Sequence, residues 1–359
     1  MANDKATATT LMPQITIPTF KLAVKHIAVE QDEPICVWGG AGNGKTEGAN
    51  QVCEEEDYEP CDLRLGQQDT IDMRGFPGVD QVKGSPTYGQ TIWYSPSMLP
   101  FIGNDQWSDT KTILLVLDEF NQGAPTVLGN AYQLVQERRL GEHVLKPNVR
   151  IVAICNREID RGIANRVPLP LCNRLTHYEL IVDAQAFAEY AMKRGIPRWL
   201  IAFWLFRQEL INTYDPDKPE KIFATPRTWF KFAKYIVADI PDELRIPSCM
   251  GVVGRGPALE AMGYRDIYEK VPSVKAIIAD PTGIAVPREA SMQYAICVKI
   301  AGDLSVKNVK PLYRFLQRMP PEFTVLGWTL AGKRDASLMT TNEFIDFGQK
   351  YRDAFSASN

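Results

Sequence analysis

Histidine is scarce in this chain, and the seven cysteines are scattered. Among 359 residues there are three histidines, and no two cysteines form a C-x-x-C pair. Structural zinc sites need clustered cysteine and histidine, and disulfide scaffolds need cysteines at regular spacing. We therefore expect neither, and the scattered cysteines are typical of reduced thiols in a cytosolic chain.

Long hydrophobic runs are also missing. Residues 1–10 are polar, unlike a signal peptide, and the longest apolar runs, such as 113–117, are short. A membrane-spanning helix needs about 20 apolar residues. The chain is therefore expected to have no membrane span and to be cytoplasmic.

A strong excess of charge of either sign is absent. The net charge is −3, with 23% charged and 45% hydrophobic residues. This balance is ordinary for a globular protein and does not favour wrapping around nucleic acid, which is the weaker alternative as a partner. The length predicts two or three domains.

A glycine-rich segment supplies the first chemical signal. It fits the pattern G-x-x-x-x-G-K-[S/T] and is formed by Gly39, Gly40, Ala41, Gly42, Asn43, Gly44, Lys45 and Thr46. A β-rich run precedes it and a helical pattern follows, which is the context of a phosphate-binding P-loop. The backbone N–H groups would bind phosphate oxygens, the lysine would reach the outer phosphates and the threonine would ligate Mg²⁺. ATP and Mg²⁺ are the expected ligands.

Two acids follow a second apolar run. Residues 113–117 read Ile-Leu-Leu-Val-Leu, and Asp118 and Glu119 come next. At the carboxyl edge of a sheet, Asp118 would hold Mg²⁺ and Glu119 would activate the attacking water, a Walker B arrangement. A helix cap is the plainer alternative for the pair taken alone. The P-loop upstream favours the catalytic interpretation.

A third apolar run ends in an amide. Residues 150–155 precede Asn156, which would lie at the same sheet edge and contact both the water and the terminal phosphate. Taken alone, an asparagine at a strand end is most often a turn residue. Its place after the Asp-Glu pair favours the functional interpretation.

These motifs, in this order, resemble AAA+ ATPases, and the MoxR-like branch of bacteria and their phages is the most similar. The resemblance implies Asn156 as sensor 1, Arg174 as an arginine finger acting on a neighbouring subunit, and Arg227 as sensor 2. Gly40 and Ala41 stand where many relatives carry proline, which leaves the phosphate contacts intact. A surface ion pair is the alternative for Arg174, and an exposed arginine at a helix start is the alternative for Arg227.

Three further arginines compete with Arg174 for the finger role. They are Arg157, Arg161 and Arg166, all in the same stretch of chain. An arginine placed in a neighbour's site offsets charge on the transferred phosphoryl group, so hydrolysis would depend on assembly.

The expected architecture is α/β: a P-loop core with a parallel sheet flanked by helices, then an all-α lid and a mainly helical C-terminal region. The domains are an N-terminal arm (1–18), the core with β-hairpin inserts (19–182), the lid (183–240) and the C-terminal region (241–359). Expected strands are 34–38, 62–65, 113–117, 150–155 and 176–182; expected helices are 19–29, 45–54, 127–138, 184–194, 199–211 and 227–238.

Two inserts complete the expected core. Segments 79–83 and 90–94 alternate around a turn at 84–86 and predict a β-hairpin, which resembles the helix-2 insert of the MoxR-like branch. Residues 136–149 resemble the pre-sensor-1 hairpin. Beyond 240, glycine- and proline-rich stretches at 251–257 and 280–287 are expected to interrupt the helices.

The resemblance implies a ring-forming homo-oligomer, expected to be a hexamer, that couples ATP hydrolysis to remodelling of a protein or protein complex. A protein substrate or adaptor is the expected partner, such as a protein with a von Willebrand factor A domain. A nucleic-acid-directed motor, or a component of a DNA-processing or restriction system, is the alternative, since one fold hosts both roles. A nucleotide-gated scaffold with negligible turnover is a third hypothesis, against which the Asp118-Glu119 pair argues.

Overall fold

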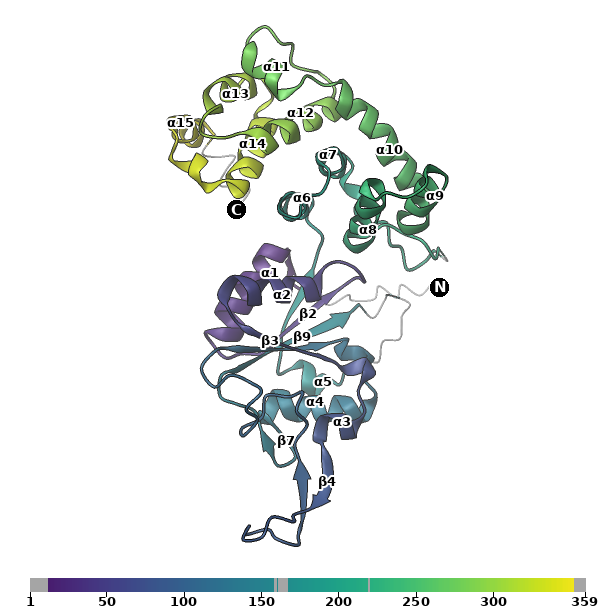
Figure 1. Cartoon of the computed structure of the whole chain (residues 1–359), viewed down its shortest axis with the longest axis vertical. Coiled ribbons are helices and arrows are strands. Elements are labelled where there is room, and N and C mark those ends of the chain that lie inside the picture. Colours follow the sequence, from purple (N-terminus) through teal and green to yellow (C-terminus); the bar gives the residue numbers. More distant parts are fainter. Residues whose placement is uncertain (1–11, 158–159, 161–166, 219, 352–359) are drawn as a thin grey trace, which may run out of the picture. The chain divides into compact units, whose positions relative to one another are not determined.

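The computed structural model describes residues 12–157, 160, 167–218 and 220–351. The chain divides into two compact units, 1–181 and 182–359, which are described separately (Figure 1). The first is an α/β unit and the second is helical. The predicted fold class, a parallel sheet flanked by helices followed by a helical region, is confirmed.

The first unit is built on a six-stranded sheet in which every neighbouring pair of strands is parallel. In spatial order the strands are β1 (Gln14–Ile15), β10 (Thr176–Leu180), β2 (Ile35–Gly39), β9 (Val149–Asn156), β6 (Ile113–Asp118) and β3 (Glu59–Arg64). Strand β9 lies between β2 and β6, and the three strands are parallel. The glycine-rich loop, Asn156 and the acidic pair lie at the carboxyl ends of these strands, so all three are at one edge of the sheet.

Helices cover both faces of this sheet because each central strand is buried on both sides. On one face lie α1 (Ile17–Ala23), its π-helical continuation (Val24–Val29) and α2 (Lys45–Glu56), packed on alternate strand residues such as Val37 and Val116. On the other face lie α3 (Thr70–Arg74), α4 (Pro125–Glu137) and α5 (Leu169–Cys172), with Trp38 and Leu117 in that core (Figure 1). Short 3-10 turns at Leu65–Gln67 and Phe120–Gln122 follow β3 and β6.

Two hairpins extend from the core. The first pairs β4 (Phe76–Val79) with β5 (Thr91–Tyr94), and the second pairs β7 (Arg139–Leu140) with β8 (His143–Val144). A hairpin near 79–94 is present, but its first strand was expected at 79–83 and lies at 76–79. The chain leaves the strand at Asp80, whose carboxylate accepts hydrogen bonds from the Val82 amide and the Thr87 hydroxyl. These bonds close the loop. Hydrogen bonding from the Ser85 side chain, followed by that from Thr87 and Val82, lowers the pKa of Asp80.

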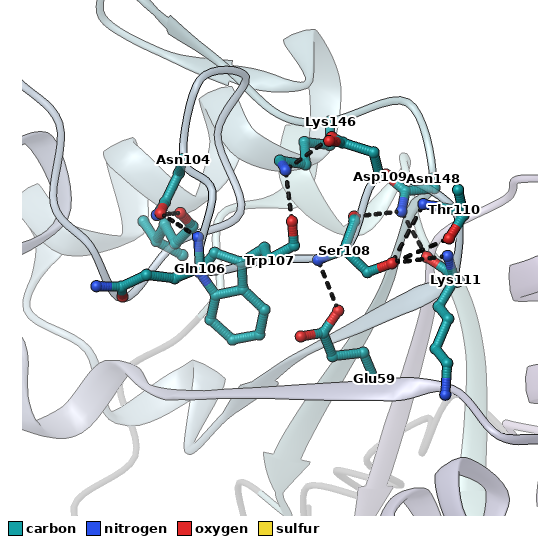
Figure 2. A network of polar contacts seen from close by, with 11 residues as sticks. Glu59, Asn104, Gln106, Trp107, Ser108, Asp109, Thr110, Lys111, Lys146 and Asn148 are labelled. Carbon is teal, nitrogen blue, oxygen red and sulfur yellow. Dashed lines mark hydrogen bonds and ion pairs between the residues drawn. The ribbon is translucent and has the colours of Figure 1, made fainter.

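The opposite, amino edge of the sheet is closed by a polar network (Figure 2). Lys146 is 2% exposed, and its Nζ donates to the Trp107 carbonyl (2.6 Å) and to Asp109 Oδ1 (2.8 Å). Asn148 Nδ2 donates to the Ser108 carbonyl, and the Ser108 amide donates to Glu59. These bonds fix the loop before β6 against the starts of β3 and β9.

The second unit consists of helices and 3-10 turns in the part that is described. They are α6 (Ala184–Lys193), α7 (Arg198–Phe206), a 3-10 turn (Gln208–Leu210), α8 (Pro226–Val237), α9 (Asp242–Val253), α10 (Arg255–Lys270), α11 (Val274–Ala279), α12 (Ala290–Asp303), α13 (Val309–Leu316), α14 (Pro321–Arg334), a 3-10 turn (Ala336–Thr340) and α15 (Asn342–Lys350). One hydrophobic core runs from Ala184 to Phe347. The expected lid (183–240) and C-terminal region (241–359) therefore share a core.

The interruption expected at 251–257 is confined to one residue. Gly254 has φ +91° between α9 and α10, whereas Gly251 and Pro257 lie inside these helices. Pro257 is the third residue of α10, where a backbone N–H has no intrahelical acceptor to lose. The second expected interruption, 280–287, does separate α11 from α12. Among the described helices, none combines the length and apolar character needed to cross a bilayer.

Candidate nucleotide-binding and hydrolysis site

The glycine-rich loop turns between β2 and α2 in the way the motif predicts. Strand β2 ends at Gly39, and α2 begins at Lys45. Between them, Gly42 (φ +80°) and Gly44 (φ +89°) adopt left-handed backbone conformations that favour glycine. The turn places the N-terminus of α2 at the carboxyl edge of the sheet, and the N-terminus of a helix is suited to binding phosphate.

Lys45 connects this loop to the neighbouring strand. Its side chain is largely buried, and Nζ donates to the carbonyls of Gly39 (2.7 Å) and Gly40 (3.0 Å). It also donates to Asn156 Oδ1 at 3.1 Å. The ammonium group is therefore held between the P-loop and the end of β9, where it can reach the outer phosphates of a nucleotide.

Thr46 and Asp118 bring the first and second motifs into contact. Thr46 Oγ1 donates to Asp118 Oδ2 at 2.9 Å. Two hard oxygen atoms at this separation can share one small divalent cation, and Mg²⁺ is typically held by one or two protein oxygens together with substrate phosphates. The donor set fits Mg²⁺, which Thr46 and Asp118 would hold.

Glu119 has an unusual backbone conformation. Its φ is +52°, in the left-handed region that a residue with a side chain rarely occupies, and its amide donates to Asp118 Oδ1 (2.8 Å). The carboxylate passes close to Gly66, since a Cβ built on that glycine would lie 2.9 Å from Glu119 Oε2. The left-handed turn sets the backbone from which this side chain projects, and the absence of a side chain at Gly66 leaves room for the carboxylate.

Negative charge accumulates at this edge of the sheet. Burial raises the pKa of Asp62, the negative charge of Asp118 adds to the effect, Arg64 opposes it, and Glu119 contributes a smaller increase. Arg64 Nε lies 3.8 Å from the Asp62 carboxylate. A cation bound at Asp118 would relieve this repulsion.

Asn156 is positioned by a residue that the sequence interpretation missed. Asn121 is fully buried; its Nδ2 donates to the Asn156 carbonyl (2.8 Å), and its Oδ1 accepts from the Asn156 amide (3.1 Å). The side chain of Asn121 thus extends the end of β9 as a neighbouring strand would. The only signal for Asn121 in the sequence is its place two residues after the acidic pair. That place does not indicate that Asn121 contacts a residue 35 positions further along the chain.

The arginines expected near the site have different surroundings. Arg157 is beside the P-loop of its own chain: a Cβ on Gly40 would lie 3.3 Å from Arg157 Nη2. Arg174 is half-buried, stacks over the Tyr132 ring (4.9 Å to the centroid) and donates to the Pro170 carbonyl. Arg161 and Arg166 lie outside the described residues.

Arg227 belongs to the helical unit. It is exposed in the first turn of α8, which Thr225 caps by accepting a hydrogen bond from the Thr228 amide (3.2 Å). The helix start predicted from Pro226 is therefore present. The site assembled within the first unit consists of the P-loop, Asp118, Glu119, Asn121 and Asn156.

Comparisons with known proteins place few constraints on function. No family model and no curated protein matches the chain. Solved structures that are similar to it include NtrX from Brucella abortus in complex with ADP, with 15% identity over 88% of this chain and 68% of that chain and a TM-score of 0.39. Another is the P216G mutant of Thermotoga maritima RuvB, with 16% identity over 84% of this chain and 90% of that one, also at 0.39. At such low scores, the functional argument rests on the geometry of the site.

Proposed function

We propose that this chain is an ATPase of the AAA+ type, which converts ATP and water to ADP and phosphate. The observation that carries the proposal is the contact of three separate motifs at one sheet edge. Lys45 is hydrogen-bonded to Asn156, and Thr46 is hydrogen-bonded to Asp118. A glycine-rich turn that arose by chance would not be expected to meet a strand-end acid pair and a strand-end amide in this way.

Each side chain then has a role in hydrolysis. Thr46 and Asp118 would hold Mg²⁺, which when bound would neutralise charge on the phosphates. Glu119 accepts a proton from the attacking water, whose oxygen forms the new bond to the terminal phosphorus while the bond to the bridging oxygen breaks and ADP leaves. Lys45 offsets the charge on the phosphate oxygens, and Asn156 orients the water and the terminal phosphate.

We further propose that the chain is a MoxR-like, ring-forming ATPase. Its homo-oligomer, expected to be a hexamer, works in the cytoplasm and remodels a protein or protein complex. The proposed adaptor is a protein with a von Willebrand factor A domain. Arg174 is proposed as the finger supplied to the neighbouring subunit, and Arg227 as sensor 2. The partly exposed guanidinium of Arg174, braced by Tyr132, supports the first of these roles.

Two substitutions separate binding from catalysis. Lys45→Ala removes the charge that meets the phosphates, and we expect ATP affinity to fall by about 100-fold or more, because charge-assisted contacts are the strongest in such a site. Glu119→Gln keeps the shape but cannot accept a proton, so we expect binding to persist while turnover falls by about 100- to 10,000-fold.

The measurements are a nucleotide titration and steady-state phosphate release. Unchanged turnover in the Glu119→Gln protein would remove Glu119 from the proposed role. For the assembly, specific activity should rise with protein concentration, because sites completed by a neighbour form only in the oligomer. A flat profile at measurable activity would contradict a finger acting between subunits.

A further inference from the structure

Arg157 is the cationic side chain that follows Asn156, and it lies beside the P-loop of its own chain. It is partly buried, with 28% of its side chain exposed. A Cβ built on Gly40, the second residue of the P-loop, would lie 3.3 Å from Arg157 Nη2, so the guanidinium lies close to this glycine. This contact is made within one chain.

A buried carboxylate holds the guanidinium in that position. Arg157 donates to Asp160 through Nη2 (3.0 Å) and Nε (3.4 Å), and the side chain of Asp160 is 9% exposed. Glu179, on β10, lies further away, with its Oε1 4.0 Å from Nη1. The Asp160 contacts use one edge of the planar guanidinium, which has five N–H donors in a fixed fork.

The location identifies the part of a nucleotide that this cation would meet. Lys45, which reaches the outer phosphates in a P-loop, is bonded to the carbonyl of the same Gly40 and to Asn156, the residue before Arg157. The guanidinium is thus on the side of the P-loop where the terminal phosphate of ATP would lie. ADP lacks this group.

On the basis of the proposed ATPase function, we propose that Arg157 contacts the terminal phosphate of ATP within its own subunit and makes the site distinguish ATP from ADP. Asp160 is a positioning residue that holds the guanidinium against the P-loop. Arg157 is then a ligand of the nucleotide in the same chain, and it is removed from the set of arginines that compete for the finger role.

The test compares the affinities of the full-length chain for a non-hydrolysable ATP analogue and for ADP, each with Mg²⁺. In Arg157→Ala, we expect affinity for the ATP analogue to fall about 10- to 100-fold, the range for a lost charge-assisted contact, with ADP affinity changed by no more than about two-fold. In Arg157→Lys, which keeps the charge but loses the fork, the loss should be smaller. The ATP-to-ADP ratio is an internal control, because misfolding would weaken both.

Lys111→Ala is the matched control, since it removes the same charge from an exposed site at the opposite sheet edge, where Lys111 pairs with Asp57. It should leave both affinities unchanged. If Arg157→Ala preserves the affinity ratio of the wild type, the proposal is overturned. It is also overturned if Arg157→Ala keeps its affinity for ATP, loses turnover, and regains turnover when it is mixed with Lys45→Ala subunits. Arg157 would then act between subunits. Absence of nucleotide binding by the wild-type chain would instead count against the proposed ATPase itself.

Discussion

Each end of the parallel sheet carries a buried lysine, and the two lysines have different partners. At the carboxyl edge, Lys45 is bonded to P-loop carbonyls and to Asn156, beside the oxygen atoms of Thr46 and Asp118. At the amino edge, Lys146 is bonded to a loop carbonyl and to Asp109, whose side chain is 81% exposed (Figure 2). The first lysine lies among groups that can bind a nucleotide and its metal ion, and the second ties a loop to the strands.

The difference shows that burial of a lysine does not by itself indicate a function. What distinguishes the two sites is the set of groups around each lysine, because left-handed backbone at residues with a side chain occurs near both, at Glu119 on one edge and at Asp57 and Arg138 on the other. Near Lys45, hydroxyl and carboxylate oxygens that suit a metal ion lie beside a helix N-terminus, whereas Lys146 has a loop carbonyl and one carboxylate. The following predictions challenge this contrast, from the largest expected effect to the smallest.

The carboxyl edge should contain one residue whose loss affects both stability and activity. Asn121→Ala leaves the amide and carbonyl of Asn156 without their partner in a buried setting, and we expect the free energy of unfolding to fall by about 2–4 kcal/mol. Turnover should fall as well, because Asn156 loses its position. Denaturant unfolding and phosphate release measure the two effects.

The control for that variant is Asn130→Ala, which removes a longer hydrogen bond (3.4 Å) to the Thr70 carbonyl. It should cost less stability and leave turnover unchanged. Equal effects of the two substitutions would show that Asn121 has no special part in positioning Asn156.

The amino edge should affect stability alone. Lys146→Ala removes the bonds to Trp107 and Asp109, and we expect the free energy of unfolding to fall by about 1–3 kcal/mol, since the part-buried carbonyl of Trp107 loses its donor. Lys111 belongs to the same network but is exposed, so Lys111→Ala should change the free energy of unfolding by less than about 0.5 kcal/mol. A loss of nucleotide affinity in Lys146→Ala, measured at a temperature where the variant is folded, would contradict the division between the two edges.

The smallest effect concerns the orientation of Glu119. In Gly66→Ala, the new Cβ would lie 2.9 Å from Glu119 Oε2, so the carboxylate must move, and we expect turnover to fall by about 10-fold with ATP affinity retained. Gly129→Ala is the matched control, because a Cβ on this glycine of α4 meets no atom within 4 Å. If both variants turn over ATP at the wild-type rate, the position of Glu119 does not depend on Gly66.

Much of the first unit could be predicted from local patterns. Residues 113–117 and 150–155 are continuous apolar runs, and the structure places them as central strands buried on both faces. The segment Gly39–Thr46 could be located because its glycine, lysine and threonine residues have the spacing that is typical of phosphate-binding loops. The sheet edge on which these segments meet followed from the parallel arrangement.

Contacts between distant segments could not be predicted in the same way. Asn121 acts through backbone groups of a strand far along the chain, and β1 (Gln14–Ile15) pairs with β10 (Thr176–Leu180), a parallel pairing that residues 14–15 alone do not reveal. The strand expected at 62–65 begins earlier, at Glu59, and contains Pro60, and β4 contains Pro77. Both prolines are tolerated because β3 is an edge strand and β4 belongs to a two-stranded hairpin, where a missing N–H donor costs little.

The most direct test of the account compares Lys45→Ala with Lys146→Ala in one experiment that measures ATP affinity and the free energy of unfolding. We expect Lys45→Ala to lose ATP binding by about 100-fold or more while it remains folded, and Lys146→Ala to bind ATP as the wild type does while it unfolds more easily. Retained ATP binding in Lys45→Ala would contradict the assignment of the carboxyl edge as the nucleotide site.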